Sequence, residues 1–198
     1  MLIGDLIIAV ALGYVVGSFP TGVLVTRLLG KPDVRFSGSG HTGGRNTYRQ
    51  VGLAGAVLTA LVDTGKGVLA AWLALRLTGT SWALVAAGLA AIIGHCWSIY
   101  IGFAGGMGLS TMGGLFFWQL PGAPVLAAAL WGLLYLLLRD SPRAVMLMTV
   151  LMAPVFWLAW RLGYASPEVL ALGLSGLAVI FIRNLTELRV YEQRMPSK

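Results

Sequence analysis

Long apolar runs that carry few charges dominate this sequence of 198 residues. A helix needs about 20 apolar residues to cross the hydrocarbon core of a membrane, and most of these runs approach or exceed that length. The chain is 58% hydrophobic and only 11% charged, which leaves too little polar surface for a water-soluble globule. The sequence therefore predicts an all-α integral membrane protein. Its apolar runs occupy residues 2–29, 51–75, 81–103, 109–120, 123–138, 144–162 and 169–182.

The number of crossings depends on the fourth run, residues 109–120, which is either a short crossing or a re-entrant segment. As a helix it would be about 18 Å long, against a hydrocarbon core of about 30 Å. If it crosses, eleven of the 14 Lys and Arg residues lie on one side and two on the other, with Lys66 inside a span. If it does not cross, the division is six to seven. The positive-inside rule therefore favours seven transmembrane helices, with the N-terminus outside and the C-terminus cytoplasmic.

Several broad properties limit the classes of partner. Basic residues on the cytoplasmic side of the membrane explain the net charge of +7. We therefore expect this chain to contact membrane lipid and not nucleic acid. Two His and one Cys without neighbouring carboxylates form no ligand set, so we expect no metal and no cofactor. The sequence has no long linker and no convincing repeat, which predicts one membrane-embedded domain over residues 1–198.

The first segment that could carry chemistry is glycine-rich, at residues 36–55. Glycine leaves backbone N–H groups accessible, so consecutive amides can surround an anion. The hydroxyl of Ser39 and the charges of Arg45 and Arg49 would add to such a phosphate site, which Asn46 could orient. The alternative is a flexible cytoplasmic loop whose arginines only follow the positive-inside rule. The glycines of the candidate cradle are Gly38, Gly40 and Gly43.

A second glycine-rich segment, residues 94–114, contains Gly105, Gly106 and Gly108 and is followed by an apolar run. A glycine turn that opens a helix presents free amides and the positive end of the helix dipole to an anion. Small residues also allow membrane helices to pack closely, and from this segment alone the two interpretations stay open. In the seven-span topology both glycine-rich segments face the cytoplasm, which favours one shared site.

Ionisable residues also occur inside the apolar runs. Asp63 and Lys66 are one helical turn apart, so they can form a structural ion pair, and contact between Lys66 and substrate is an equal alternative. His95 lies near the inner end of the third run, where it could be a general base or a hydrogen-bonded structural residue.

Taken in order, these segments resemble one family, the bacterial membrane acyltransferases that acylate glycerol 3-phosphate from an acyl phosphate. The family's GSxPxG element corresponds to residues 17–22, and its loop GSGNxGxxNxxR to residues 38–49. Its DxxKG element corresponds to residues 63–67, and its GH…GGxG element to residues 94–108. Seven spans with the N-terminus outside is also the topology of that family.

The resemblance implies a fold, a reaction and a set of roles. The implied substrates are acyl phosphate and glycerol 3-phosphate, the implied products are lysophosphatidate and phosphate, and the implied location is the bacterial cell membrane. In this interpretation Ser39 and the neighbouring glycine amides bind phosphate or the oxyanion, and Arg49 neutralises phosphate. Asn46 would orient the acceptor, and His95 would be a supporting donor or a base.

The sequence departs from the family pattern at several positions. Ala104 and Met107 replace both lysines of the family's FKGGKG loop, while His41 and Arg45 replace Asn and Thr in its first loop. Only Arg183 is kept from the RHxxN element near the C-terminus. The lost lysines leave open a non-catalytic relative that binds phospholipid head groups or regulates a partner. A third hypothesis is a small-anion transporter. The small number of charged residues inside the membrane argues against it.

Overall fold

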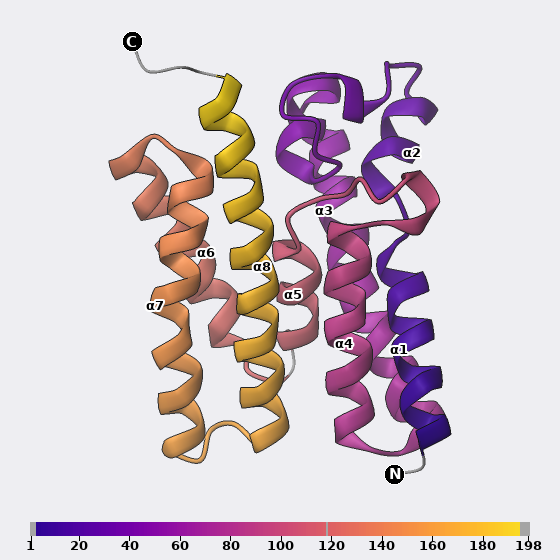
Figure 1. Cartoon of the computed structure of the whole chain (residues 1–198), viewed down its shortest axis with the longest axis vertical. Coiled ribbons are helices and arrows are strands. Elements are labelled where there is room, and N and C mark those ends of the chain that lie inside the picture. The colour runs from indigo at the N-terminus through magenta and orange to yellow at the C-terminus, as the bar shows by residue number, and fades with distance from the viewer. Residues whose placement is uncertain (1–2, 118, 195–198) are drawn as a thin grey trace. The chain divides into compact units, whose positions relative to one another are not determined.

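The computed structural model describes the backbone of residues 3–117 and 119–194 and the side chains of residues 3–117 and 119–188. Within these ranges the chain is helical and contains no strand (Figure 1). The chain divides into two compact units, Met1–Leu115 and Phe116–Lys198.

The first unit begins with an apolar helix that breaks next to Pro20. Helix α1 covers Ile3–Gly17 and α2 covers Thr21–Leu28. Proline at position 20 has no N–H to donate and its ring clashes with the preceding turn, which favours a break or a kink at this point. At the break the carbonyl oxygens of Ser18 and Phe19 accept hydrogen bonds from the side chains of Ser98 and Lys66.

Two long helices form an antiparallel hairpin behind α1. Helix α3 covers Gly44–Thr78, and α4 covers Ser81–Cys96, with Gly79 in the left-handed region between them. Gly52 has a non-helical φ of 73° and ψ of −168°, so α3 is kinked two turns after it begins. Because the helices run in opposite directions, the loop before α3 and the loop after α4 lie at the same end of the hairpin (Figure 1).

Short elements complete the first unit. A 3₁₀ turn, η1, covers Val34–Phe36 in the loop before α3, and η2 covers Ile99–Ile101 after α4. Helix α5, Leu109–Phe116, has only eight residues. The third apolar run thus ends its α-helix at Cys96, earlier than the expected boundary at 103, because a glycine-rich loop follows.

Glycine allows the helices of this unit to approach closely. A Cβ atom on Gly13 would lie 2.2 Å from the carbonyl oxygen of Ala87, and one on Gly17 would lie 2.1 Å from that of Ala91. On the other side of the hairpin, a Cβ on Gly67 would lie 2.1 Å from the carbonyl oxygen of Thr111. In lipid the hydrophobic effect does not drive helices together, and small residues at such crossings allow the close van der Waals packing that does.

The second unit contains three apolar helices. They are α6 (Gly122–Leu138), α7 (Ser141–Arg161) and α8 (Pro167–Arg194). Within this unit the rings of Phe116 and Phe156 pack at 4.8 Å between centroids, and Gly173 lies against the Phe156 ring. Helix α7 continues through Pro154 without interruption.

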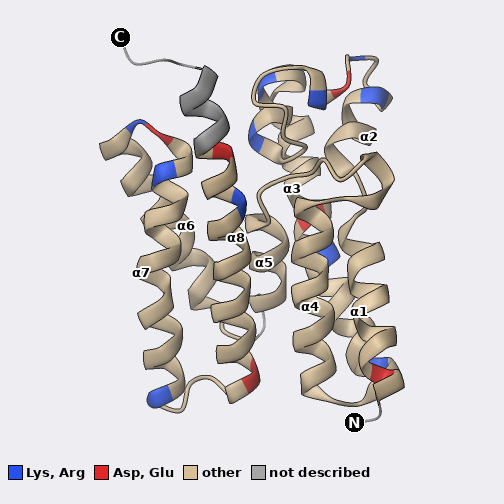
Figure 2. Cartoon of the chain, viewed as in Figure 1, with Lys and Arg blue, Asp and Glu red and all other residues tan. Residues whose placement is uncertain are grey.

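Length and composition agree with a multi-pass membrane protein. Five helical stretches of the described chain are long and apolar enough to cross a membrane, and α6 is a shorter apolar helix. Charged residues lie mainly at helix ends and in loops, while most of each helix is uncharged (Figure 2). The few charges inside the first unit are therefore the exception, and they mark the region where the candidate site lies. The five stretches are Ile3–Leu28, Gly44–Thr78, Ser81–Ile101, Ser141–Arg161 and Pro167–Leu188.

Candidate functional site

The first glycine-rich loop is organised around the side chain of Asn46. This residue is buried in the first turn of α3, and its Oδ1 accepts a hydrogen bond from the backbone N–H of Ser39 at 3.1 Å. Its amide nitrogen donates to three carbonyl oxygens of the loop, at 2.9–3.0 Å. The amide is thus bonded to the main chain and shapes the loop, while its predicted role in orienting the acceptor stays a prediction. The three carbonyls belong to Val34, Ser37 and His41.

Two glycines of this loop adopt conformations that other residues avoid. Gly38 has φ +58° and Gly40 has φ +76°. A Cβ on Gly38 would also lie 2.1 Å from Oδ1 of Asn46, so both backbone angle and space require glycine there. The turn leaves the side chain of Ser39 exposed, while the N–H groups of Ser39 and Gly40 donate to Asn46 and to the carbonyl oxygen of Ser37.

Helix α3 begins directly after this loop, and no side chain caps it. Gly43 is its N-cap residue, and the first turn carries no acidic residue. Arg45 and Arg49 instead project from the first two turns and are exposed. Cations at the positive end of a helix are unfavourable unless an anion lies between them and the free amides. This end of α3 is therefore suited to an anion such as phosphate.

The second glycine-rich loop follows η2 and folds back onto the end of α4. The N–H of Gly106 donates to the carbonyl oxygen of His95 at 2.9 Å, and the N–H of Ser98 donates to that of Ala104 at 2.9 Å. Gly105, Gly106 and Gly108 are buried, whereas Ala104 and Met107 are partly exposed. The family positions that carry lysine thus lie at the accessible side of a tightly held turn.

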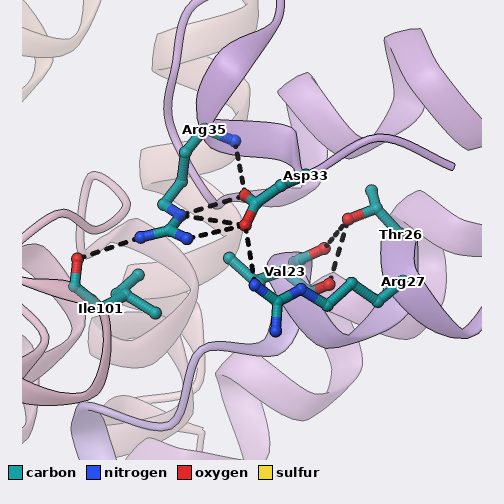
Figure 3. Close-up of polar contacts among 7 residues, drawn as sticks. Val23, Thr26, Arg27, Asp33, Arg35 and Ile101 are labelled. Atoms are coloured by element: carbon teal, nitrogen blue, oxygen red, sulfur yellow. Dashed lines mark hydrogen bonds and ion pairs between the residues drawn. The ribbon is translucent and has the colours of Figure 1, made fainter.

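Two bonds join the loops to each other. The N–H of Thr42 donates to the carbonyl oxygen of Gly105 at 3.3 Å. The guanidinium of Arg35 donates to the carbonyl oxygen of Ile101 at 3.2 Å, so η1 is fixed to η2 (Figure 3). The two glycine-rich segments are therefore in direct contact at one end of the first unit, and a shared site there stays a prediction.

Asp33 holds Arg35 in this position (Figure 3). The carboxylate accepts from Arg35 at 2.7–3.2 Å and from the more exposed Arg27 at 3.3 Å. The hydrogen bonds from Arg35 lower the pKa of Asp33 from 3.8 to about 2. The carboxylate therefore stays ionised, and the Arg35 clamp stays in place, at any physiological pH.

Below the loops, three buried ionisable side chains meet. Nζ of Lys66 lies 2.7 Å from Oδ1 of Asp63, 3.2 Å from Nδ1 of His95 and 2.9 Å from the carbonyl oxygen of Phe19 in the α1–α2 break. All three side chains are at most 6% exposed. The ion pair is the one that the i, i+3 spacing suggested, but the participation of a main-chain oxygen was not visible in the sequence.

Most predicted site residues thus come together at one end of the first unit. Ser39, Arg45 and Arg49 are exposed there, the glycines of the first loop are exposed or half-buried, and those of the second loop are buried. His95 contacts the buried pair from the end of α4. Sequence reasoning missed Arg35 and Phe19, because Arg35 lies in a loop of ordinary composition and Phe19 acts through its carbonyl oxygen. It also did not foresee that the backbone N–H of Thr42 joins the two loops. Gly22 carried a signal in the GSxPxG element: a Cβ there would lie 2.0 Å from the carbonyl oxygen of Thr42, so α2 supports the first loop directly.

Comparison with known proteins places this arrangement in a family. The family model described as glycerol-3-phosphate acyltransferase matches residues 7–191. The chain belongs to the glycerol-3-phosphate acyltransferase family. Relatives with this name include proteins of Rubrobacter xylanophilus, 40% identical over 88% of this chain and 86% of the relative, and of Pseudomonas aeruginosa, 41% identical over 76% and 78%.

Two solved structures of the glycerol-3-phosphate acyltransferase PlsY share the fold. The glycerol 3-phosphate form superposes with a TM-score of 0.78 at 29% identity, covering 98% of this chain and 96% of that one. The lysophosphatidic acid form gives 0.76 at 27% identity, covering 96% and 93%. PlsY is described as an integral membrane protein, and the present chain is an all-helical integral membrane member of the same family.

Proposed function

We propose that this glycerol-3-phosphate acyltransferase transfers an acyl group from acyl phosphate to the 1-hydroxyl of glycerol 3-phosphate. The hydroxyl oxygen forms an ester bond to the acyl carbon as the bond from that carbon to the phosphate oxygen breaks. The hydroxyl proton ends on the released phosphate or in water. The products are lysophosphatidate and inorganic phosphate. Family membership over residues 7–191 is the observation that carries this proposal.

The mixed anhydride is already activated, so the protein has to align two phosphorylated substrates and stabilise developing charge. In this proposal the hydroxyl of Ser39, the amides of Gly38 and Gly43 and the exposed guanidinium of Arg49 supply donors and charge at the start of α3. The N–H groups of Gly40 and Gly106 donate to the carbonyl oxygens of Ser37 and His95, so these two glycines shape the loops, while the amides of Gly105 and Gly108 are the proposed donors of the facing loop. In this proposal Asn46 shapes the loop, and Asp63 with Lys66 supports His95 from below.

Arg45 is the proposed substitute for the charge that the family lysines supply. It lies three residues after Thr42, whose N–H is bonded to the loop that carries Ala104 and Met107. Arginine can hold phosphate with two parallel hydrogen bonds, so one guanidinium can replace more than one ammonium contact. The function therefore does not require lysine at positions 104 and 107.

We also infer a seven-span topology, with the N-terminus outside and the C-terminus cytoplasmic, in the inner membrane of a bacterial cell. The distribution of Lys and Arg supports it, as do the five long apolar helices together with α6. Helix α5 is only about 12 Å long, so its crossing would include the extended segment 105–108 before it. On this topology the chain acts as one membrane-embedded domain.

The direct experiment uses protein purified in detergent with acyl phosphate and glycerol 3-phosphate. Mass spectrometry should detect lysophosphatidate, and released phosphate should match it in amount. Acyl phosphate with glycerol in place of glycerol 3-phosphate is the control for simple hydrolysis. A folded protein that binds glycerol 3-phosphate and forms no lysophosphatidate would instead be the non-catalytic relative that the missing lysines suggest.

A further inference from the structure

Lys66 has as many acceptors around it as an ammonium group has protons. Its Nζ lies within 2.7–3.2 Å of Oδ1 of Asp63, the carbonyl oxygen of Phe19 and Nδ1 of His95. These acceptors come from α3 itself, from the α1–α2 break and from the end of α4. An ammonium group has three N–H donors and no acceptor, and here it has one ion-pair partner, Asp63, and two further neighbours at hydrogen-bond distance, the Phe19 carbonyl and the His95 ring.

The consequence for His95 follows from its ring nitrogens. A neutral imidazole has one protonated and one unprotonated nitrogen, and the partner of one nitrogen decides which is which. Because Lys66 can only donate, Nδ1 of His95 is the acceptor. The competing partner, Oδ1 of Asp63, lies 3.7 Å from Nδ1, which is too far for a hydrogen bond. The proton of the ring therefore belongs on Nε2.

The opposite side of the ring faces the second glycine-rich loop. A Cβ built on Gly106 would lie 2.2 Å from Nε2 of His95, so the ring edge lies directly against this glycine. The backbone of the same two residues is bonded as well, from the N–H of Gly106 to the carbonyl oxygen of His95. A donor at Nε2 is thus placed beside the loop amides that are proposed to stabilise developing negative charge.

We infer that Asp63 and Lys66 are positioning residues that hold His95 with its proton on Nε2, so that the imidazole serves as a hydrogen-bond donor at the loop of residues 105–108 and not as a general base. This inference rests on the proposed acyl transfer for its catalytic meaning. The tautomer itself is a property of the folded chain and can be measured without turnover.

The first test measures the tautomer in the unmodified protein. The chain has two histidines, His41 and His95, so labelling histidine with ¹⁵N produces two pairs of ring signals, and His41→Gln assigns them. For His95 at neutral pH we expect an unprotonated Nδ1 and a protonated Nε2. In Lys66→Met, which keeps the length of the side chain without its donor, both tautomers should appear. A proton on Nδ1 of His95 in the unmodified protein would overturn the inference.

The second test separates a donor from a base. In His95→Gln the amide nitrogen can reach the place of Nε2 and donate there, whereas in His95→Asn the shorter amide reaches only the place of Nδ1. We expect His95→Gln to keep kcat within about tenfold of the unmodified enzyme, and His95→Asn and His95→Ala to lose roughly 100-fold or more. Equal loss in all three variants would support a base and contradict the donor role.

Two controls keep these outcomes separate. Size-exclusion chromatography and thermal unfolding show whether each variant is folded. The tautomer of His95 is measured in the unmodified protein, so that measurement does not depend on the folding of His95 or Lys66 variants. If the unmodified protein shows Nε2–H on His95 but transfers no acyl group, the proposed function fails and the buried arrangement stands. If it transfers acyl groups with Nδ1–H on His95, only the present inference fails.

Discussion

The backbone N–H of Thr42 donates to the carbonyl oxygen of Gly105 at 3.3 Å, and this bond joins the loop before α3 to the loop after α4. Because α3 and α4 are antiparallel, both loops lie at the same end of their hairpin. Each loop alone has the composition of an ordinary glycine-rich turn. Thr42 and Arg35 hold the two loops together at that end, where we propose that the substrates meet.

Removing the guanidinium of Arg49 should weaken substrate binding without unfolding the protein, because this side chain is exposed. A hydrogen bond to a charged group contributes about 1.5–3 kcal/mol, so KM for the phosphorylated substrate should rise roughly 10- to 150-fold in Arg49→Ala. Steady-state kinetics on purified protein measures this. Arg76→Ala, at the other end of α3, is the matched control and should leave KM unchanged. If KM is unchanged in both Arg49→Ala and Arg76→Ala, the first loop does not bind phosphate through Arg49.

Arg45 should be essential if it replaces the family lysines. We expect Arg45→Ala to reduce turnover strongly, and addition of Ala104→Lys with Met107→Lys to restore part of it. The assay compares lysophosphatidate formation by the single and triple variants side by side. If Arg45→Ala leaves lysophosphatidate formation unchanged while the two added lysines raise it, the hypothesis that Arg45 compensates for the lost lysines is wrong.

Asn46 tests whether an amide shapes the first loop. In Asn46→Asp, an acceptor would replace the donor that faces the carbonyls of Val34, Ser37 and His41. Leaving buried polar groups without partners costs about 1–3 kcal/mol each, so Asn46→Asp should lower thermal stability at least as much as Asn46→Ala. A direct contact to substrate would instead lower activity while the melting temperature stays the same.

Gly65 and Gly67 form a matched pair on α3. A Cβ at position 65 meets no atom within 4 Å, while one at position 67 would lie 2.1 Å from the carbonyl oxygen of Thr111. Gly65→Ala should therefore keep or slightly raise thermal stability, by about 0.5–1 kcal/mol at most, because alanine favours the helix. Gly67→Ala should lower it clearly, since two backbones would have to separate. Similar melting temperatures for both variants would argue against this packing.

Four introduced cysteines test the topology, on a background in which Cys96 is buried. With seven spans, positions 45 and 143 should react with an impermeant thiol reagent from one side of sealed vesicles, and positions 76 and 161 from the other. If α5 is re-entrant, position 161 reacts from the same side as position 45.

Much of this site could be predicted from the sequence because glycine spacing and helix periodicity are local signals. The break at residues 17–22 and the Asp63–Lys66 pair needed only the properties of proline and one helical turn. The role of Asn46 could not be predicted in this way, since an amide hydrogen-bonds equally well to substrate and to main chain. The contact between Lys66 and the carbonyl oxygen of Phe19 could not be predicted either. Every residue has a carbonyl group, and only the geometry of the helix break makes this one available to a side chain.

The contact between Lys66 and the carbonyl of Phe19 has a consequence for biogenesis. An ammonium group is expensive to place in lipid without partners. The ribosome delivers Phe19 before Asp63 and Lys66, and His95 last, so α3 enters the membrane beside a helix that already exposes an acceptor for its cation. The break between α1 and α2 therefore provides an acceptor for this cation that is synthesised before Lys66 itself and before α4.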